Sequence, residues 1–316
     1  MTEHRLGIIM NGVTGRMGTN QHLIRSILAI MKEGGVKLDN GDTVMPDPIL
    51  VGRNAGKVKA LAKKHDVARW TTDLDGAIAN PDDTLFFDSA STNLRAELLR
   101  KAIDAGKDIY CEKPLCQSIK EARRMVQAVR THKRVFQTGS MQRSSEEFRV
   151  ACELVRNGII GPITRVEVAV GGPAKPCDLP EEAMEPGLDW DRWLGPAPKR
   201  PYNSTLSPRG VHNHYPAWRN YREYGGGGVT DWGAHHFDIA QWGLGMDQEG
   251  PRRILPSQNP ESGHGVRMIY QNGVEMIHSD GNGVTFHGKE GKIQVNRGKF
   301  AFWLGEKQIA SDRKQC

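Results

Sequence analysis

The sequence has few cysteines and no long apolar run. Its five cysteines among 316 residues are an odd number, and no two of them show the C-x-x-C spacing. This pattern argues against a disulfide framework and a thiolate zinc site, and favours a reduced intracellular setting. No apolar run approaches the roughly 20 residues that cross a bilayer. Because a first strand is expected at residues 6–10, no room is left for a signal peptide. We therefore expect a cytoplasmic protein that does not bind membranes.

The chain also carries little excess charge. Its formal net charge is +6, with 38% hydrophobic and 25% charged residues. Basic residues alternate with acidic ones, and the densest basic stretch, 121–134, is typical of a solvated helix face. A nucleic-acid groove is the less favoured alternative, because no recognition motif accompanies the charge. We expect no nucleic-acid partner, although a mild positive charge suits an anionic cofactor or substrate.

The first part of the chain alternates short apolar runs with amphipathic segments. Strands are expected at 6–10, 49–51, 84–87, 109–111 and 135–137, and helices at 21–31, 57–64, 94–105 and 119–131, with Asn20 capping the first helix. Strands separated by helices imply right-handed crossovers and a parallel sheet. The pattern predicts an α/β fold, with a doubly wound, Rossmann-type dinucleotide-binding domain over residues 1–138.

The rest of the chain shows a different pattern. A helix is expected at 146–157, a strand with one wet face at 163–170, and a helix at 231–242. The tail 265–304 contains Asn272-Gly273 and Asn282-Gly283, which are hairpin signals. The segment 171–223, rich in Pro and Trp, is too long for a simple connection and is expected to fold over a site. We predict an α+β domain with a mostly antiparallel sheet over residues 139–316.

A glycine-rich turn follows the first expected strand and opens the first helix. Glycines at positions 12, 15 and 18 allow a tight turn and let backbone N–H groups reach a pyrophosphate at a helix N-terminus. A purely structural turn is the alternative, but the position between strand and helix favours a cofactor. The predicted cofactor contacts here are Gly12, Thr14, Gly15, Arg16, Met17 and Gly18.

The end of the second expected strand indicates which cofactor is bound. An acidic residue at this place accepts hydrogen bonds from the ribose 2′-OH of NAD. This chain has Gly52 and Arg53 instead. Arg53 can pair with a 2′-phosphate, which favours NADP over NAD. The alternative is that Arg53 is only a solvated residue at the start of a helix.

Two further constellations suggest catalysis. Glu112-Lys113-Pro114 follows the strand 109–111, at the sheet edge where ligands bind, so Lys113 can face the nicotinamide. Asp231 and His235 lie one helical turn apart, and a carboxylate so placed can orient an imidazole that accepts a proton near neutral pH. The alternative for this pair is a capping and core role.

On these residues the chain resembles the Gfo/Idh/MocA family of glucose–fructose oxidoreductases and inositol dehydrogenases. The resemblance runs over nearly the whole length and rests on the glycine turn, the stretch 105–115, and the Gly-rich segment before Asp231 and His235. It implies a Rossmann domain followed by a substrate-binding domain with an open antiparallel sheet that often serves oligomerisation. A homo-oligomer, either dimer or tetramer, is therefore expected.

The resemblance also implies an NAD(P)-dependent dehydrogenase or reductase that acts on CH–OH groups of a sugar, polyol or cyclitol. His235 would take the hydroxyl proton, Lys113 would polarise that oxygen beside the nicotinamide, and Asp231 would orient the set. Glu112 is implied as a cofactor contact. Ser91, which stands where the family often shows a Thr-Pro-Asn run, is implied as another.

The sequence contains further candidate residues and allows other functions. Arg143, Trp190 and Trp193 are candidates for substrate contact, the tryptophans because aromatic faces stack on sugars. His212 and His214, with His235 and His236, could gather a metal, but cofactor chemistry already explains His235, so we expect no metal. Redox-assisted cleavage of a glycoside and a non-enzymatic NADP-binding sensor remain alternatives. Lys113, Asp231 and His235 together argue against the sensor.

Overall fold

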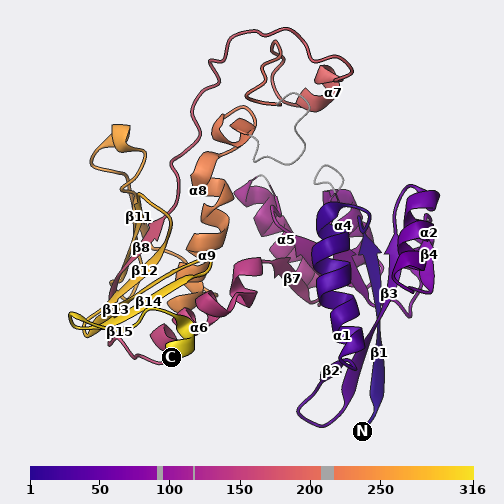
Figure 1. Ribbon diagram of the computed structural model, residues 1–316, viewed down its shortest axis with the longest axis horizontal. Helices are drawn as coiled ribbons and strands as arrows, with labels where there is room; N and C mark the ends of the chain where they lie inside the picture. Colours follow the sequence, from indigo (N-terminus) through magenta and orange to yellow (C-terminus); the bar gives the residue numbers. More distant parts are fainter. Residues whose placement is uncertain (91–94, 117, 208–216) are drawn as a thin grey trace. The chain divides into compact units, whose positions relative to one another are not determined.

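The computed structural model describes residues 1–90, 95–116, 118–207 and 217–316. The chain divides into two compact units, Met1–Gly139 and Ser140–Cys316 (Figure 1). None of the helices within the described ranges is long and apolar enough to cross a membrane.

The first unit is built on a mostly parallel sheet of seven strands. The order is β2 (Val36–Lys37), β3 (Thr43–Val51), β1 (Glu3–Asn11), β5 (Leu85–Asp88), β6 (Asp108–Glu112) and β7 (Phe136–Gly139), and β4 (Arg69–Thr71) also pairs with β3. The two short strands share the outer edge of β3: β2 pairs antiparallel with its start and β4 pairs parallel with its end. The predicted doubly wound parallel sheet is confirmed.

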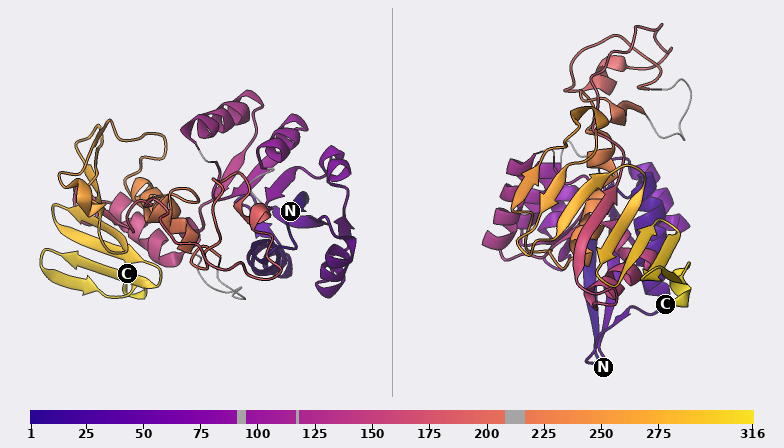
Figure 2. Two further views of the ribbon diagram at one scale, coloured as in Figure 1. Left: turned by 90° about the horizontal axis from the view of Figure 1, so that it is seen from above. Right: turned by 90° about the vertical axis from the view of Figure 1, so that its left-hand side faces the viewer.

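Helices cover both faces of this sheet (Figure 2). The sheet is buried on both sides, because successive strand residues point to opposite faces. Ile8, Met10 and Leu50 pack with the first helix and with α2 (Ala55–Lys64). Ile9 and Phe86 pack with α3 (Leu74–Ala79), α4 (Arg95–Asp104) and α5 (Ile119–Thr131).

The structure corrects two expectations in the first crossover. The first helix begins at Met17, as the π-type helix η1 (Met17–Ile27) that continues into α1 (Leu28–Lys32), so Asn20 is not its cap. Strand β3 is six residues longer at its start than the expected 49–51, despite Pro46 and Pro48. Both prolines lie in register with β1, between the parts of β3 that pair with β2 and β4, so one edge of β3 is unpaired there, which is where a strand tolerates proline.

The second unit contains a mostly antiparallel sheet of eight strands, as predicted. The order is β15 (Lys307–Ala310), β14 (Lys299–Leu304), β13 (Gly291–Asn296), β12 (Gly283–Gly288), β8 (Ile163–Ala169), β11 (Glu275–Ser279), β10 (Arg267–Ile269) and β9 (Arg253–Leu255). The turn at Asn272-Gly273 joins the antiparallel pair β10 and β11, which confirms one hairpin. The hairpin predicted at Asn282-Gly283 is wrong, because β8 lies between β11 and β12 and pairs parallel with β11.

Two helices, α6 (Glu146–Arg156) and α9 (Gly233–Gly243), pack on one face of this sheet. Phe148 of α6 and Ile239 of α9 are fully buried against Val166, Val168 and Phe286 of the central strands. The right-hand view of Figure 2 shows this sheet face on. The burial alternates along β8, as the sequence predicted for a strand with one wet face.

The long segment after β8 forms a small core of its own. Trp190 and Leu194 of α7 (Trp190–Leu194) pack with Tyr202, Leu206 and Tyr221. The remaining short elements of the second unit are η3 (Met141–Ser144), η4 (Ala217–Asn220), α8 (Gly227–Asp231), η5 (Pro260–Ser262) and η6 (Arg313–Gln315). A segment with its own buried cluster is more than a connection, and it leads directly into α8 and α9.

Candidate functional site

The glycine turn after β1 is shaped by two close backbone approaches. Gly12 has a φ of +77°, and a Cβ placed there would lie 2.6 Å from the Ala90 nitrogen. A Cβ at Gly18 would lie 2.6 Å from the Gly12 carbonyl oxygen. Real Cβ atoms do not approach backbone so closely, so both positions need glycine. Gly15 is less restricted: its added Cβ would lie 3.3 Å from the same oxygen.

The turn presents an open helix N-terminus. Thr14, Gly15, Arg16 and Met17 are exposed, while Val13 and Gly18 are buried. Within the described residues the first turn of η1 contains no acidic residue, and the residue at its N-cap makes no side-chain capping hydrogen bond. Unsatisfied backbone N–H groups and the helix dipole favour an anion at such a terminus. The cofactor residues predicted in this stretch therefore lie together and fit a pyrophosphate.

Arg53 lies next to this turn. A Cβ added to Gly52 would lie 3.5 Å from Cγ2 of Thr14, so the end of β3 packs against the turn. Arg53 is exposed, and in the part of the chain that the structure describes it forms no ion pair. Asn54 caps α2 by accepting a hydrogen bond from the Lys57 nitrogen at 2.9 Å. The cap fixes the start of α2 and leaves the Arg53 guanidinium available for a ligand.

The carboxyl end of β6 carries the Glu-Lys-Pro tripeptide. Oε1 of Glu112 lies 2.9 Å from Nε2 of His22 on η1, and the Tyr110 hydroxyl donates to it at 3.3 Å. Burial, with Glu112 as a secondary cause, raises the pKa of Tyr110. Lys113 follows, half-buried, and its peptide bond to Pro114 is cis. Glu112 thus holds the first helix against β6, and its direct contact with a cofactor stays a prediction.

In the second unit, a run of glycines positions the helix that carries the predicted catalytic pair. Gly227 has a φ of +71°, and a Cβ there would lie 2.5 Å from the Ala174 nitrogen. A Cβ at Gly228 would lie 2.5 Å from the Gly171 Cα. The run lets α8 begin in direct backbone contact with the chain that leaves β8.

Asp231 and His235 lie one turn apart along nearly continuous helix. Asp231 ends α8, Trp232 keeps helical backbone angles, and α9 follows, so the helix begins at Gly227 rather than at the expected Asp231. His235 is buried, with 7% of its surface exposed. Asp231 Oδ2 accepts a hydrogen bond from Arg219 Nη1 at 3.0 Å.

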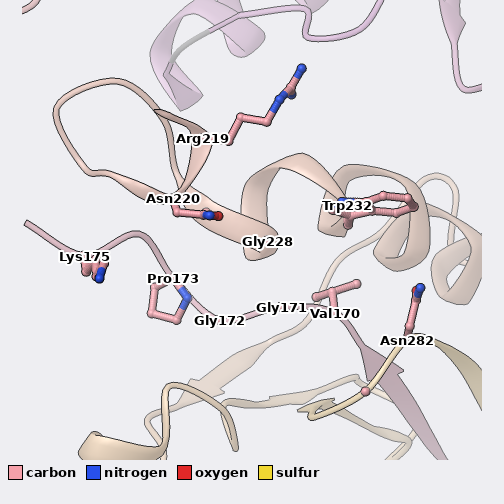
Figure 3. Close-up of a pocket in the computed structure, with 12 residues that line it drawn as sticks. Val170, Gly171, Gly172, Pro173, Lys175, Arg219, Asn220, Gly228, Trp232 and Asn282 are labelled. Carbon is pink, nitrogen blue, oxygen red and sulfur yellow. The ribbon is translucent and has the colours of Figure 1, made fainter. Parts of the chain in front are cut away.

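A cavity of about 510 Å³ lies beside this helix (Figure 3). Its polar and aromatic lining comes from Lys175, Arg219, Asn220, Trp232 and Asn282, and the rest is mainly backbone of 170–173 and 227–228. In Figure 3 the side chains of Trp232 and Asn282 face each other at one end of the cavity. Sequence reasoning missed Arg219, Asn220 and Asn282, because only the fold brings Asn282 to the consecutive residues Arg219 and Asn220.

The structure gives other partners to three residues predicted as substrate contacts. Arg143 donates two hydrogen bonds of 2.8 Å to Asp238 and one of 2.7 Å to Asp247, which raise its pKa. Its guanidinium is therefore engaged within the second unit. Trp190 is 8% exposed, donates to the Arg200 carbonyl at 2.8 Å and stacks on Trp193 at 4.5 Å. Both tryptophans belong to the local core around α7, and contact of Arg143, Trp190 or Trp193 with a substrate stays a prediction.

Three predicted residues lie outside the described residues, namely Ser91, His212 and His214. The described residues contain no cluster of metal-ligating side chains. His236 is fully buried, with its ring nitrogens 3.2 Å from the Trp232 carbonyl oxygen and 3.4 Å from Asn296 Oδ1. Its role is to join α9 to the end of β13.

His236 gives a testable pH dependence of stability. Burial lowers its pKa in the folded chain. Below about pH 6.5 the unfolded chain therefore takes up a proton that the folded chain does not. As the pH decreases, the free energy of unfolding decreases too, by up to about 1.4 kcal/mol per pH unit. His236→Gln is expected to reduce the loss of urea-unfolding free energy between pH 7.5 and 5.5. His132→Gln, at an exposed position of the first unit, should lose as much unfolding free energy over this pH range as the wild type. If His236→Gln also lost as much as the wild type, this account would be refuted.

The fold and the glycine turn define a dinucleotide-binding protein with an added α+β unit. Residues 48–140 match the family model described as "Oxidoreductase family, NAD-binding Rossmann fold", and residues 173–301 match "Oxidoreductase family, C-terminal alpha/beta domain". The chain belongs to the Gfo/Idh/MocA oxidoreductase family, which confirms the resemblance seen in the sequence.

Individual relatives match over part of their length. The chain is 51% identical to D-xylose dehydrogenase of Paenarthrobacter nicotinovorans over 115 residues, which are 36% of this chain and 30% of that protein. It is 27% identical to myo-inositol 2-dehydrogenase of Thermotoga maritima over 120 residues, which are 38% of this chain and 36% of that protein. These matches thus span about a third of either enzyme.

Solved structures match over nearly all of this chain. Levoglucosan dehydrogenase in complex with NADH and levoglucosan has a TM-score of 0.59 at 20% identity, covering 97% of this chain and 77% of that one. Aldose–aldose oxidoreductase from Caulobacter crescentus, complexed with glycerol, has a TM-score of 0.58 at 16% identity, covering 100% and 86%. At these identities the likeness shows a shared fold.

Proposed function

We propose that the protein is an NAD(P)-dependent dehydrogenase or reductase that acts on a CH–OH group of a sugar, polyol or cyclitol. The observation that carries the proposal is the open glycine turn, which leaves the N-terminus of η1 free for a pyrophosphate at the carboxyl end of β1. Membership of a family of oxidoreductases and the names of the relatives support the same reaction class.

Cofactor binding would involve residues of the first unit only. Gly12, Gly15 and Gly18 would admit the pyrophosphate, and Arg53 would pair with the 2′-phosphate of NADP. When bound, the nicotinamide supplies the acceptor or donor of the hydride, which is the chemistry that the protein itself lacks. NADP is the proposed preference, and the family match itself is to an NAD-binding fold.

Lys113, Asp231 and His235 are the proposed catalytic residues. In the oxidation direction, the Lys113 ammonium would bind and polarise the substrate hydroxyl oxygen. His235 would accept the hydroxyl proton while the hydride leaves the same carbon, and Asp231 would orient the substrate and the imidazole. His235 is suited to this role because its burial at the start of α9 restricts its orientation.

The cavity beside α8 is the proposed sugar site. Arg297 lies over the Trp232 ring, 4.3 Å from its centroid, so the rest of the indole that lines the cavity would meet the C–H face of a sugar. The amides of Asn220 and Asn282 can hydrogen-bond hydroxyl groups. Arg219 lines this cavity and contacts Asp231, which would connect the bound sugar to the catalytic set.

The experiment that tests the function is a titration with NADPH and NADH, followed by a substrate panel. Binding is read by fluorescence of the reduced nicotinamide, and turnover of aldoses, polyols and cyclitols by absorbance at 340 nm. The proposal predicts saturable binding and reduction of the oxidised cofactor by at least one member of the panel. Absence of dinucleotide binding would refute it.

Replacing Arg53 by alanine tests the preference for NADP. Loss of a charge-assisted contact to the 2′-phosphate is expected to weaken the binding of NADPH by about 10- to 100-fold, since such contacts contribute about 1.5–3 kcal/mol. NADH, which lacks that phosphate, should bind within about twofold of the wild type. Lys63→Ala, which removes an exposed cation from the last turn of α2, is the control for net charge. Equal losses for both cofactors would contradict the assignment of Arg53.

We also propose that the protein forms a homo-oligomer, either a dimer or a tetramer. Light scattering coupled to size-exclusion chromatography would measure it, and a monomeric mass would contradict it without affecting the redox assignment.

A further inference from the structure

A buried ion pair lies behind the glycine turn. Asp88 ends β5 and has no exposed surface, and Arg95 begins α4 with 4% of its surface exposed. Arg95 Nε donates to Asp88 Oδ2 at 2.8 Å. Neither residue belongs to the motifs that indicated cofactor binding, and no sequence pattern connects the two.

The pair connects the ends of three neighbouring strands. Asp88 Oδ1 accepts from the Asn11 amide at 3.0 Å and from the Ala90 nitrogen at 3.3 Å. Arg95 donates to the Ala90 carbonyl at 3.1 Å and to the Pro114 carbonyl at 2.5 Å. One carboxylate and one guanidinium thus hold the carboxyl ends of β1, β5 and β6.

Each contacted group adjoins a part of the proposed cofactor site. Asn11 immediately precedes Gly12, and Ala90 is the backbone against which Gly12 packs. Pro114 follows Lys113, the proposed catalytic cation. Fixing these three points fixes the position of Lys113 relative to the turn that would receive the pyrophosphate.

Stability alone does not account for such a pair. Removing two charges from water costs about as much free energy as their attraction returns, and apolar residues of similar volume are often as stabilising. What apolar residues cannot do is hold these four carbonyl and N–H groups at set distances. Each side-chain nitrogen of Arg95 and each carboxylate oxygen of Asp88 makes at least one hydrogen bond, and such satisfied buried polar groups specify one geometry.

We propose that Asp88 and Arg95 are positioning residues for hydride transfer. They would set the position of Lys113 relative to the glycine turn that receives the cofactor. This inference rests on the proposed function. The two residues would not touch the substrate or the nicotinamide, and their effect would pass through Pro114, Ala90 and Asn11.

The first unit offers a matched control at its other edge. Asp83, just before β5, also has no exposed surface, and Arg69 donates to its two oxygens at 2.8 and 2.5 Å. This pair lies at the amino end of β5, away from the cofactor turn. It shares the chemistry of the Asp88–Arg95 pair without the contacts to the turn.

The test compares Arg95→Lys with Arg69→Lys in the full chain. Lysine keeps the charge but cannot reach Asp88, Ala90 and Pro114 at once. Arg95→Lys is expected to lower kcat about 100-fold, the typical effect of misplacing a catalytic group by about 1 Å. The Kd for NADPH should change less than about threefold, because the turn itself remains. Arg69→Lys should lower the thermal midpoint while keeping kcat within about twofold.

A deuterium isotope effect separates positioning from general loss of structure. With a carbon-deuterated substrate, Arg95→Lys should raise the isotope effect on kcat, because a misplaced Lys113 makes hydride transfer rate-limiting. The double variant Asp88→Asn/Arg95→Gln keeps hydrogen-bonding groups without charge and should show the same pattern if Arg95→Lys does not fold. If the wild type is active and a folded Arg95 variant keeps its kcat, the inference is overturned. It is also overturned if Arg69→Lys loses as much kcat as Arg95→Lys. A wild type that turns over no substrate overturns the proposed function and this role with it.

Discussion

Lys113→Ala is expected to lower kcat by about 10³-fold or more while the Kd for NADPH stays within about threefold of the wild-type value. The ammonium of Lys113 is proposed to bind the oxygen whose charge changes as the proton and hydride leave. A preorganised donor of this kind stabilises the transition state more than the ground state, so its loss appears in kcat. Pyrophosphate binding uses the glycine turn and does not need this cation.

The measurement is steady-state turnover at 340 nm beside a fluorescence titration with NADPH. Lys120→Ala is the matched control, because it removes an exposed lysine from the first turn of α5. It should leave both quantities unchanged. If Lys113→Ala kept more than a tenth of the wild-type kcat, Lys113 would lose its catalytic assignment.

The second large effect is expected for Gly12→Ala. The substitution places a Cβ 2.6 Å from the Ala90 nitrogen and forces alanine to a φ of +77°. The strain of the left-handed conformation costs about 1–3 kcal/mol, and the clash requires the turn to move away from the segment after β5. Both the unfolding free energy and the affinity for the dinucleotide should fall, the latter by about 100-fold.

Gly106→Ala separates the strain of the left-handed backbone from the clash with Ala90. Gly106, at the end of α4, has a φ of +76°, and a Cβ there would meet nothing within 4 Å. It should show the strain cost by urea unfolding and no change in NADPH affinity. If Gly106→Ala and Gly12→Ala changed the affinity equally, the close approach of Gly12 to Ala90 would not be what shapes the cofactor turn.

The sequence predicted the elements whose signals are local. The apolar runs that became β1, β5 and β6 are buried on both faces, and the Gly-rich turn needs a residue without Cβ at Gly12 and Gly18. The first helix began earlier than predicted because the turn folds directly into it, so its N-terminus has no capping side chain to recognise.

Strand order was less predictable, because it depends on contacts between distant segments. The Asn282-Gly283 turn has the composition of a hairpin. It joins β11 to β12 along the chain, yet β8 lies between these two strands in the sheet. Arg143 and Trp190 carry the chemistry of a substrate site, and the sequence could not show that their side chains also make hydrogen bonds and ring contacts within the second unit. The Asp88–Arg95 pair had no sequence signal, since ordinary charged residues become unusual only when they are buried.

The central claim is that a hydride moves between a nicotinamide and a hydroxyl-bearing carbon of a sugar-like substrate. The most direct measurement uses wild-type protein, NADP⁺ or NAD⁺, and a panel of aldoses, polyols and myo-inositol deuterated at every carbon. Mass spectrometry of the reduced cofactor should show one deuterium, because the hydride comes directly from carbon and does not exchange with water. A reduced cofactor without deuterium, or no reduced cofactor with any member of the panel, would contradict the account.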